Sequence, residues 1–187
     1  QGVISSASTP KPSITVAIDA GHGGIDGGTV GVQTGKDENF LNLEYSLYLK
    51  ELLSSYNIDV VMTRTTLNGL YNPFSENKKL DDMAKRKEIV KQSGAEILLS
   101  IHMNSFPLSS SRGAQTFYKK GNEQGLQLAD SIQNQLSKNL ENTKVGGKVG
   151  DFYMVNCTEI PSVLIECGFL SNAEDEKLLI SDKYQDK

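Results

Sequence analysis

Apolar residues follow two alternating patterns along this chain. Some segments are short, continuous runs rich in Val, Ile and Leu, which are typical of buried β-strands. In others, apolar residues recur every three or four positions, as on one face of an amphipathic helix. The runs predict strands at residues 14–18, 59–64, 97–102, 113–119, 152–155 and 162–165. The periodic segments predict helices at residues 41–56, from Asp81 or Asp82 to Gly94, at 123–140 and after Asn172.

This alternation of strands and helices predicts the fold class. It favours an α/β protein, a single three-layer domain with a twisted, mostly parallel sheet and helices on both faces. Such a sheet binds its ligands at the carboxyl-terminal ends of the strands, so we expect the active site there. Residues 1–13 are rich in Ser, Thr and Pro, and we expect a flexible linker that leads into a folded domain at 14–187.

Three of the predicted strands end at ionisable side chains. The first strand is followed by Asp19 and then by His22. His102 closes a second strand, and Glu166 follows the last one. Because the carboxyl ends of parallel strands meet at one edge of a sheet, we expect these side chains to converge there.

His22 and His102 are the only histidines of the chain. A single histidine is more often a core or surface residue than a ligand, but both of these follow a buried strand. Imidazole is the commonest metal ligand, so the placement favours a metal site, and two histidines with one carboxylate are a standard set for catalytic zinc. Spacing leaves the carboxylate open among Asp26, Asp37, Glu38 and Glu44. Glu38 also fits a first-turn acid that complements a helix dipole.

Glu166 follows a run of four residues that should be buried, Ser162 to Ile165. A buried carboxylate is costly unless it is paired or coordinates something. Partial burial would raise its pKa, which suits a residue that takes a proton from water and passes it to a leaving amine. The alternative is a structural ion pair with a buried arginine, either Arg64 or Arg86.

The glycine cluster at residues 21–28 has a competing interpretation as a phosphate-binding loop. A dinucleotide-binding turn would need the pattern G-x-G-x-x-G, and Asp26 occupies the place of its third glycine. The chain also lacks the Gly-Lys-Ser or Gly-Lys-Thr of a nucleotide-binding P-loop. The sequence therefore favours a metal site over a phosphate site.

Composition narrows the function classes further. The net charge of -4 argues against a nucleic-acid or anionic-lipid partner, both of which favour a basic surface. No apolar run is long enough to cross a membrane. Two cysteines, Cys157 and Cys167, are too few for a disulfide scaffold, and we interpret them as buried free thiols.

Four segments, in order along the chain, carry a family resemblance. They are residues 18–27 (IDAGHGGIDG), 38–43 (ENFLNL), 99–105 (LSIHMNS) and 161–172 (PSVLIECGFLSN). They resemble the signatures of the zinc-dependent cell-wall amidases of the amidase-3 family. The resemblance implies that His22, Glu38 and His102 bind one catalytic zinc ion and that Glu166 is the catalytic acid–base. Among the four candidate carboxylates, Glu38 is chosen on this resemblance alone.

The resemblance also implies an activity and a setting. It makes residues 14–187 a catalytic amidase domain that hydrolyses the bond between the lactyl group of N-acetylmuramic acid and the L-alanine of the stem peptide in peptidoglycan. Within the family, the chain is most similar to the sporulation and germination amidases of endospore formers. This implies export to the cell wall or spore cortex, and we expect the chain to be a mature or trimmed form without its targeting peptide.

Some members of the family carry a helical insert that plugs the active site. Here the predicted strands and helix between Met103 and Ile165 leave no room for such an insert. We therefore expect activity to be controlled by compartment, by a regulatory or zinc-loading protein partner, or by the supply of zinc. Two alternative functions use the same layout: another zinc peptidase or deacetylase, and a non-catalytic peptidoglycan-binding module.

Overall fold

The computed structural model describes residues 14–140 and 143–187, so the linker expected at 1–13 lies outside the described residues. The described strands form one sheet in the order β2-β1-β3-β6-β4-β5. They are β1 (Thr15–Ala20), β2 (Asp59–Met62), β3 (Ile97–Asn104), β4 (Gln115–Tyr118), β5 (Lys148–Val149) and β6 (Ser162–Phe169). The described helices are α1 (Glu38–Ser55), α2 (Lys78–Gln92), α3 (Glu123–Asn139), α4 (Tyr153–Asn156), α5 (Ala173–Leu179) and α6 (Asp182–Gln185).

The sheet is mostly parallel, as the alternation of elements predicts. β2, β1, β3 and β6 run parallel to one another, whereas β4 pairs antiparallel to β6 and β5 runs parallel to β4. The parallel strands connect through α1, α2 and longer segments, because a parallel connection must cross back over the sheet. The carboxyl ends of β1, β3 and β6 therefore meet at one edge.

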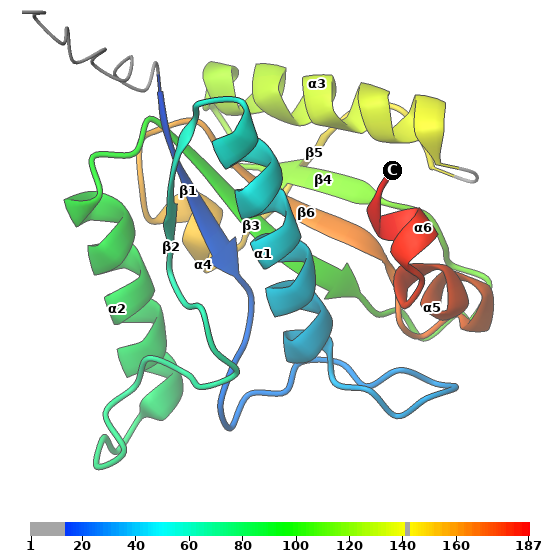
Figure 1. The fold of residues 1–187 in the computed structure, drawn as a ribbon, viewed down its shortest axis with the longest axis horizontal. Helices are drawn as coiled ribbons and strands as arrows, with labels where there is room; N and C mark the ends of the chain where they lie inside the picture. The colour runs from blue at the N-terminus through cyan, green and yellow to red at the C-terminus, as the bar shows by residue number, and fades with distance from the viewer. Residues whose placement is uncertain (1–13, 141–142) are drawn as a thin grey trace, which may run out of the picture.

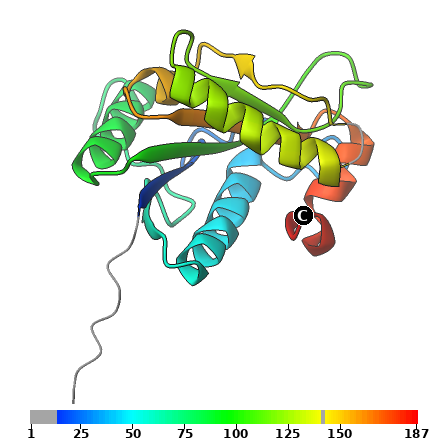
Figure 2. The same ribbon diagram turned by 90° about the horizontal axis from the view of Figure 1, so that it is seen from above.

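Each face of the sheet packs against its own helices, because successive side chains of a strand point to opposite sides. Val16 and Ile18 of β1 belong to the core on the face that α1 and α3 cover. Ala17, between them, packs on the other face with Val90 of α2 and Met154 of α4. Figures 1 and 2 show α1 and α4 on opposite sides of the sheet. The predicted three-layer α/β architecture is confirmed.

The start of α2 differs from the prediction. The helix begins at Lys78, and the side chain of Asn77 caps it by accepting a hydrogen bond from the Leu80 N–H at 3.0 Å. Asp81 and Asp82, predicted as caps, lie in and after the first turn. Their carboxylates accept backbone N–H groups of the preceding loop instead, from Asn72 and Leu70.

The prediction of a strand at residues 152–155 is wrong, because this segment forms the short helix α4. Met154 and Val155 are both buried although they are adjacent, which a strand with one exposed face would not allow. A four-residue apolar run fits a strand or a helix equally well, so its pattern does not distinguish the two. The two-residue strand β5 and the last helix, α6, are absent from the prediction, since both are too short to show a period.

The two cysteines are free thiols. Cys157 packs with the core beneath α2 and α4, whereas Cys167 packs on the face that α1 covers, so the sheet lies between them. Burial raises the pKa of Cys167 to about 12 and also raises that of Cys157. Both thiols therefore stay protonated at neutral pH. None of the described helices is long and apolar enough to span a bilayer.

Candidate active site

Three side chains from three different elements converge at the carboxyl edge of the sheet. His22 lies in the loop after β1, Glu38 is the first residue of α1, and His102 is on β3. Glu38 Oε1 lies 3.2 Å from His22 Nε2 and 3.0 Å from His102 Nδ1. One possible ligand atom from each residue falls within 4.8 Å of the others. The arrangement fits one metal ion.

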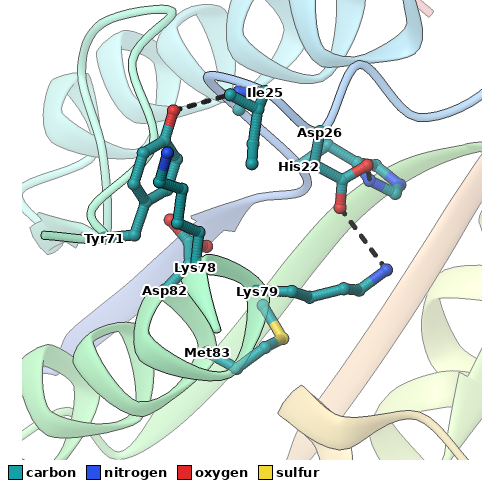
Figure 3. Close-up of a pocket in the computed structure, with 9 residues that line it drawn as sticks. His22, Ile25, Asp26, Tyr71, Lys78, Lys79, Asp82 and Met83 are labelled. Atoms are coloured by element: carbon teal, nitrogen blue, oxygen red, sulfur yellow. Dashed lines mark hydrogen bonds and ion pairs between the residues drawn. The ribbon is translucent and has the colours of Figure 1, made fainter. Parts of the chain in front are cut away.

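The other carboxylates that spacing left open lie elsewhere. Glu44 is exposed on α1, and Asp37 is the residue before that helix. Asp26 contacts the other nitrogen of the His22 ring from the one that faces Glu38: its Oδ1 lies 2.9 Å from His22 Nδ1. Figure 3 shows Asp26 between His22 and Lys79, whose Nζ lies 3.5 Å from Asp26 Oδ2.

Glu38 is bound tightly as a carboxylate. Its Oε1 accepts the Met103 N–H and the Asn42 side-chain amide, each at 3.1 Å, and its Oε2 accepts the Thr29 N–H at 2.9 Å. Burial alone would raise its pKa, but the hydrogen bonds with His102 and His22 outweigh burial and hold the pKa well below the usual range. Glu38 is therefore ionised and aimed at both imidazoles.

Close backbone packing brings the two histidines together. The Gly21 N–H donates to the Ile101 carbonyl at 3.0 Å, and a Cβ at Gly21 would come within 2.2 Å of the His102 ring. Only glycine fits this position. The two imidazole rings lie edge to face, with their centroids 5.0 Å apart.

Two buried arginines hold the loop that carries His22. Arg64 donates to the carbonyl oxygens of Ala20 at 2.8 Å and Gly21 at 2.7 Å. Arg86 donates to the Ala20 carbonyl at 2.7 Å and also to the His22 carbonyl. Neither arginine pairs with Glu166, so the structural ion pair considered from the sequence is not formed.

Asp19, the remaining strand-end acid, is part of this support and not of the candidate metal site. Its carboxylate accepts hydrogen bonds from Thr63 at 2.7 Å, Ser100 at 2.7 Å and Arg86 at 2.8 Å. Arg86 is also paired with Asp82. Since every strong partner of Asp19 is internal, it has no oxygen to offer a ligand at the sheet edge.

Glu166 lies opposite His102 in the pairing of β3 with β6, inside the strand and not after it. It is 8% exposed, and its Oε2 has no hydrogen-bond partner. Burial raises its pKa to about 7. Together with His22, Glu38 and His102, it lines a cavity of about 490 Å³. An unpaired carboxyl with a pKa near neutrality is suited to accept and donate a proton.

Comparison with known proteins places the chain among cell-wall amidases. A family model described as N-acetylmuramoyl-L-alanine amidase (Amidase_3) matches residues 16–187. The germination-specific N-acetylmuramoyl-L-alanine amidase of Bacillus subtilis is 35% identical over 185 residues, covering 96% of this chain and 77% of that protein. LytC, an amidase of the same species, is 30% identical over 180 residues, which span 95% of this chain and 34% of LytC.

A solved structure shows the same fold. The CwlD amidase of Clostridioides difficile, in complex with the GerS lipoprotein, superposes with a TM-score of 0.87 and 39% sequence identity. The match covers 92% of this chain and 90% of CwlD.

Proposed function

Because this chain belongs to the Amidase_3 family of N-acetylmuramoyl-L-alanine amidases, we propose that His22, Glu38 and His102 hold one catalytic zinc ion and that Glu166 is its acid–base partner. The family is metal-dependent and acts on peptidoglycan, and this chain hydrolyses the amide between the lactyl group of N-acetylmuramic acid and L-alanine. The convergence of two imidazoles on one ionised carboxylate supports the proposal.

The donor set favours zinc over other common cations. Two imidazole nitrogens and one carboxylate oxygen form the His₂Glu set of catalytic zinc sites, which leave one position for water or substrate. Calcium and magnesium prefer sites made of oxygen atoms alone. Asp26 accepts a hydrogen bond from Nδ1 of His22, as in the carboxylate–histidine pairs that orient metal ligands.

In the proposed mechanism, His22, Glu38 and His102 would hold the metal ion, and Glu166 moves the proton. Zinc, when bound, lowers the pKa of water towards roughly 7 and polarises a carbonyl group. Glu166 accepts the proton of the attacking water with its unpaired oxygen. The same carboxyl then delivers that proton to the nitrogen of L-alanine, which leaves as a free amine. Its pKa near 7 lets it perform both transfers at neutral pH.

The relatives support a setting for this reaction. One is named a germination-specific amidase, and CwlD was solved in complex with the GerS lipoprotein. We infer that this protein is exported to the cell wall or spore cortex and acts on cortex peptidoglycan. A regulatory or zinc-loading protein partner is part of the same proposal, by analogy with CwlD.

Mass spectrometry of the fragments released from purified peptidoglycan tests the proposal. We expect the zinc-loaded chain to release stem peptides that begin with L-alanine, and Glu166→Gln to lose at least about a hundredfold in rate. Zinc content, measured in parallel, should be unchanged. Glu159→Gln is the matched control, because Glu159 is an exposed surface acid whose side chain pairs with Lys119.

Other outcomes identify the alternatives. Full activity of Glu166→Gln would remove Glu166 from the mechanism. Release of acetate without stem peptide would indicate a deacetylase. Zinc and peptidoglycan binding with no release of fragments, even with a candidate partner added, would indicate a binding module.

A further inference from the structure

We propose that a second cavity, beyond Glu166 on the same face of the sheet, binds the acidic stem peptide through Lys144 and Lys148. This inference rests on the proposed amidase function and adds the direction in which the substrate lies. The cavity has a volume of about 710 Å³ and shares Asn104 with the cavity that holds the candidate metal ligands. The two spaces are therefore adjacent.

The pairing of the strands makes one continuous floor from the metal ligands to the second cavity. His102 lies opposite Glu166, and Glu166 lies opposite Gln115, so these three side chains form a row on one face. Directly opposed residues in neighbouring strands point to the same side of a sheet.

A second row runs alongside the first. Leu164 of β6 lies opposite Phe117 of β4, which lies opposite Lys148 of β5. Phe152 lines the metal cavity and packs edge to face on Phe117, with ring centroids 5.2 Å apart. A peptide leaving the metal site across β6 would therefore meet Phe117 and then Lys148.

Charge indicates what the cavity binds. Its charged lining residues, among those that the structure describes, are Arg112, Lys144 and Lys148, all cationic. Arg112 Nε lies 3.8 Å from Asp175 Oδ1 and is partly neutralised, so the two lysines supply most of the positive charge. In a protein of net charge -4, such a site favours an anionic ligand.

The cavity on the opposite side of the metal site has both positive and negative lining residues. It borders His22 and contains Lys78 and Lys79, but Asp26 and Asp82 line it as well, and Lys79 contacts Asp26 (Figure 3). Its charges cancel. The glycan, whose lactyl carboxyl is neutral while it is amide-linked to the peptide, fits that side better than a chain of carboxylates does.

The proposed chemistry assigns the same direction independently. Glu166 delivers its proton to the leaving amine, and that amine belongs to the stem peptide. Since Glu166 lies between His102 and Gln115 in its row, the leaving group lies on the side towards β4 and β5. Strands are spaced about 4.8 Å apart, so Lys148 on β5 lies about 10 Å from β6. An extended peptide spans this distance in about three residues, which places the lysines near the second and third stem residues.

Matched substrates and matched variants test the inference. The substrates are a muramoyl peptide with free side carboxylates on its second and third residues and the same molecule with those carboxylates amidated. We expect Lys148→Glu to lower kcat/KM about fivefold for the carboxylate substrate and to leave the amidated one unchanged. Lys144→Glu should act in the same way. Lys138→Glu, an equal charge change on α3 across the sheet, should change neither.

A binding measurement separates this inference from the proposed function. The released stem peptide and its amidated form are titrated into the zinc-loaded Glu166→Gln variant, which needs no turnover. If Lys148→Glu, added to this variant, weakens binding of the carboxylate form alone, the result supports the proposed cavity. The inference would be overturned if the Glu166→Gln variant bound both peptides equally, or if Lys148→Glu lowered kcat/KM equally for both substrates. A thermal melt of each variant identifies any loss that comes from misfolding.

Discussion

At the level of single residues, His22 is constrained from two directions. Its backbone has a φ of 60°, a left-handed conformation that is uncommon for any residue but glycine. Arg86 donates to its carbonyl oxygen, which holds this conformation from within the fold. On the solvent side, Asp26 accepts a hydrogen bond from Nδ1, the outer nitrogen of the His22 ring. These contacts direct the His22 ring towards Glu38 and His102.

The contact with Asp26 leads to a prediction about metal affinity. Asp26→Ala should weaken zinc binding about 10- to 100-fold, because loss of a carboxylate behind a ligating histidine frees its ring. Asp26→Asn should lose less, since its amide oxygen still accepts a hydrogen bond. Competition with a fluorescent zinc chelator measures both. Lys78→Gln is the control in the same cavity, because the Lys78 ammonium lies over the Tyr71 ring. An unchanged zinc affinity in Asp26→Ala would show that Asp26 does not orient His22.

At the level of elements, the start of α2 depends on Asn77 and not on the acids that follow it. Asn77 satisfies the Leu80 N–H, while Asp81 and Asp82 bind the loop before the helix. The same helix carries Arg86 to the loop of His22. Fraying at the start of α2 would therefore loosen the support of the candidate metal site.

Asn77→Ala should lower the free energy of unfolding by about 1 kcal/mol, the usual loss when a capping side chain is removed. Urea unfolding followed by circular dichroism measures the change. Asn134→Ala, at an exposed position inside α3, is the control and should be neutral or slightly stabilising, because alanine has the higher helix propensity. If Asn77→Ala left the free energy of unfolding unchanged, the helix would begin at another residue.

At the level of the whole molecule, one buried carboxylate connects several parts of the fold. Asp19 at the end of β1 binds Thr63 after β2, Ser100 of β3 and Arg86 of α2. Burial would raise its pKa, but the charge of Arg86 and the hydroxyl groups of Thr63 and Ser100 hold the pKa below the usual range. Folding therefore favours the ionised form of Asp19.

This lowered pKa predicts the acid sensitivity of the fold. A carboxyl with a lowered folded-state pKa stabilises the protein above its unfolded pKa of about 3.9, and the stabilisation is lost as the pH falls through the folded pKa. We expect unfolding free energy to fall below about pH 4 in the natural protein, and Asp19→Asn to lose about 3 kcal/mol at pH 7 with a shallower dependence on acid. Urea unfolding at pH 7, 5, 4 and 3 measures both.

Asp59→Asn provides the control for this series, because Asp59 is exposed at the edge strand. It should leave both the stability at pH 7 and the acid profile nearly unchanged. An acid profile of Asp19→Asn that parallels the natural protein would assign the sensitivity to other carboxyls.

The fold class and the sheet edge that carries the candidate site follow from local patterns in the sequence. Periods of two and three to four residues arise from local geometry, so strands such as residues 97–102 and helices such as 123–140 are predictable within a few residues. Polar residues at the ends of buried runs are also a local signal. It placed His22, His102 and Glu166 at one edge, where the structure brings them together.

Which of these groups meet depends on the packing of distant segments. Glu38 and His102 are 64 residues apart, and the sequence pattern around Asp26, Asp37 and Glu44 is no less suitable for a ligand. Asp19 looked equivalent to Glu166, yet Arg86 from α2 neutralises the first, while the second keeps an unpaired oxygen. The physical reason is the same in each case: the packing of distant elements sets contact and desolvation, and a local pattern carries no information about either.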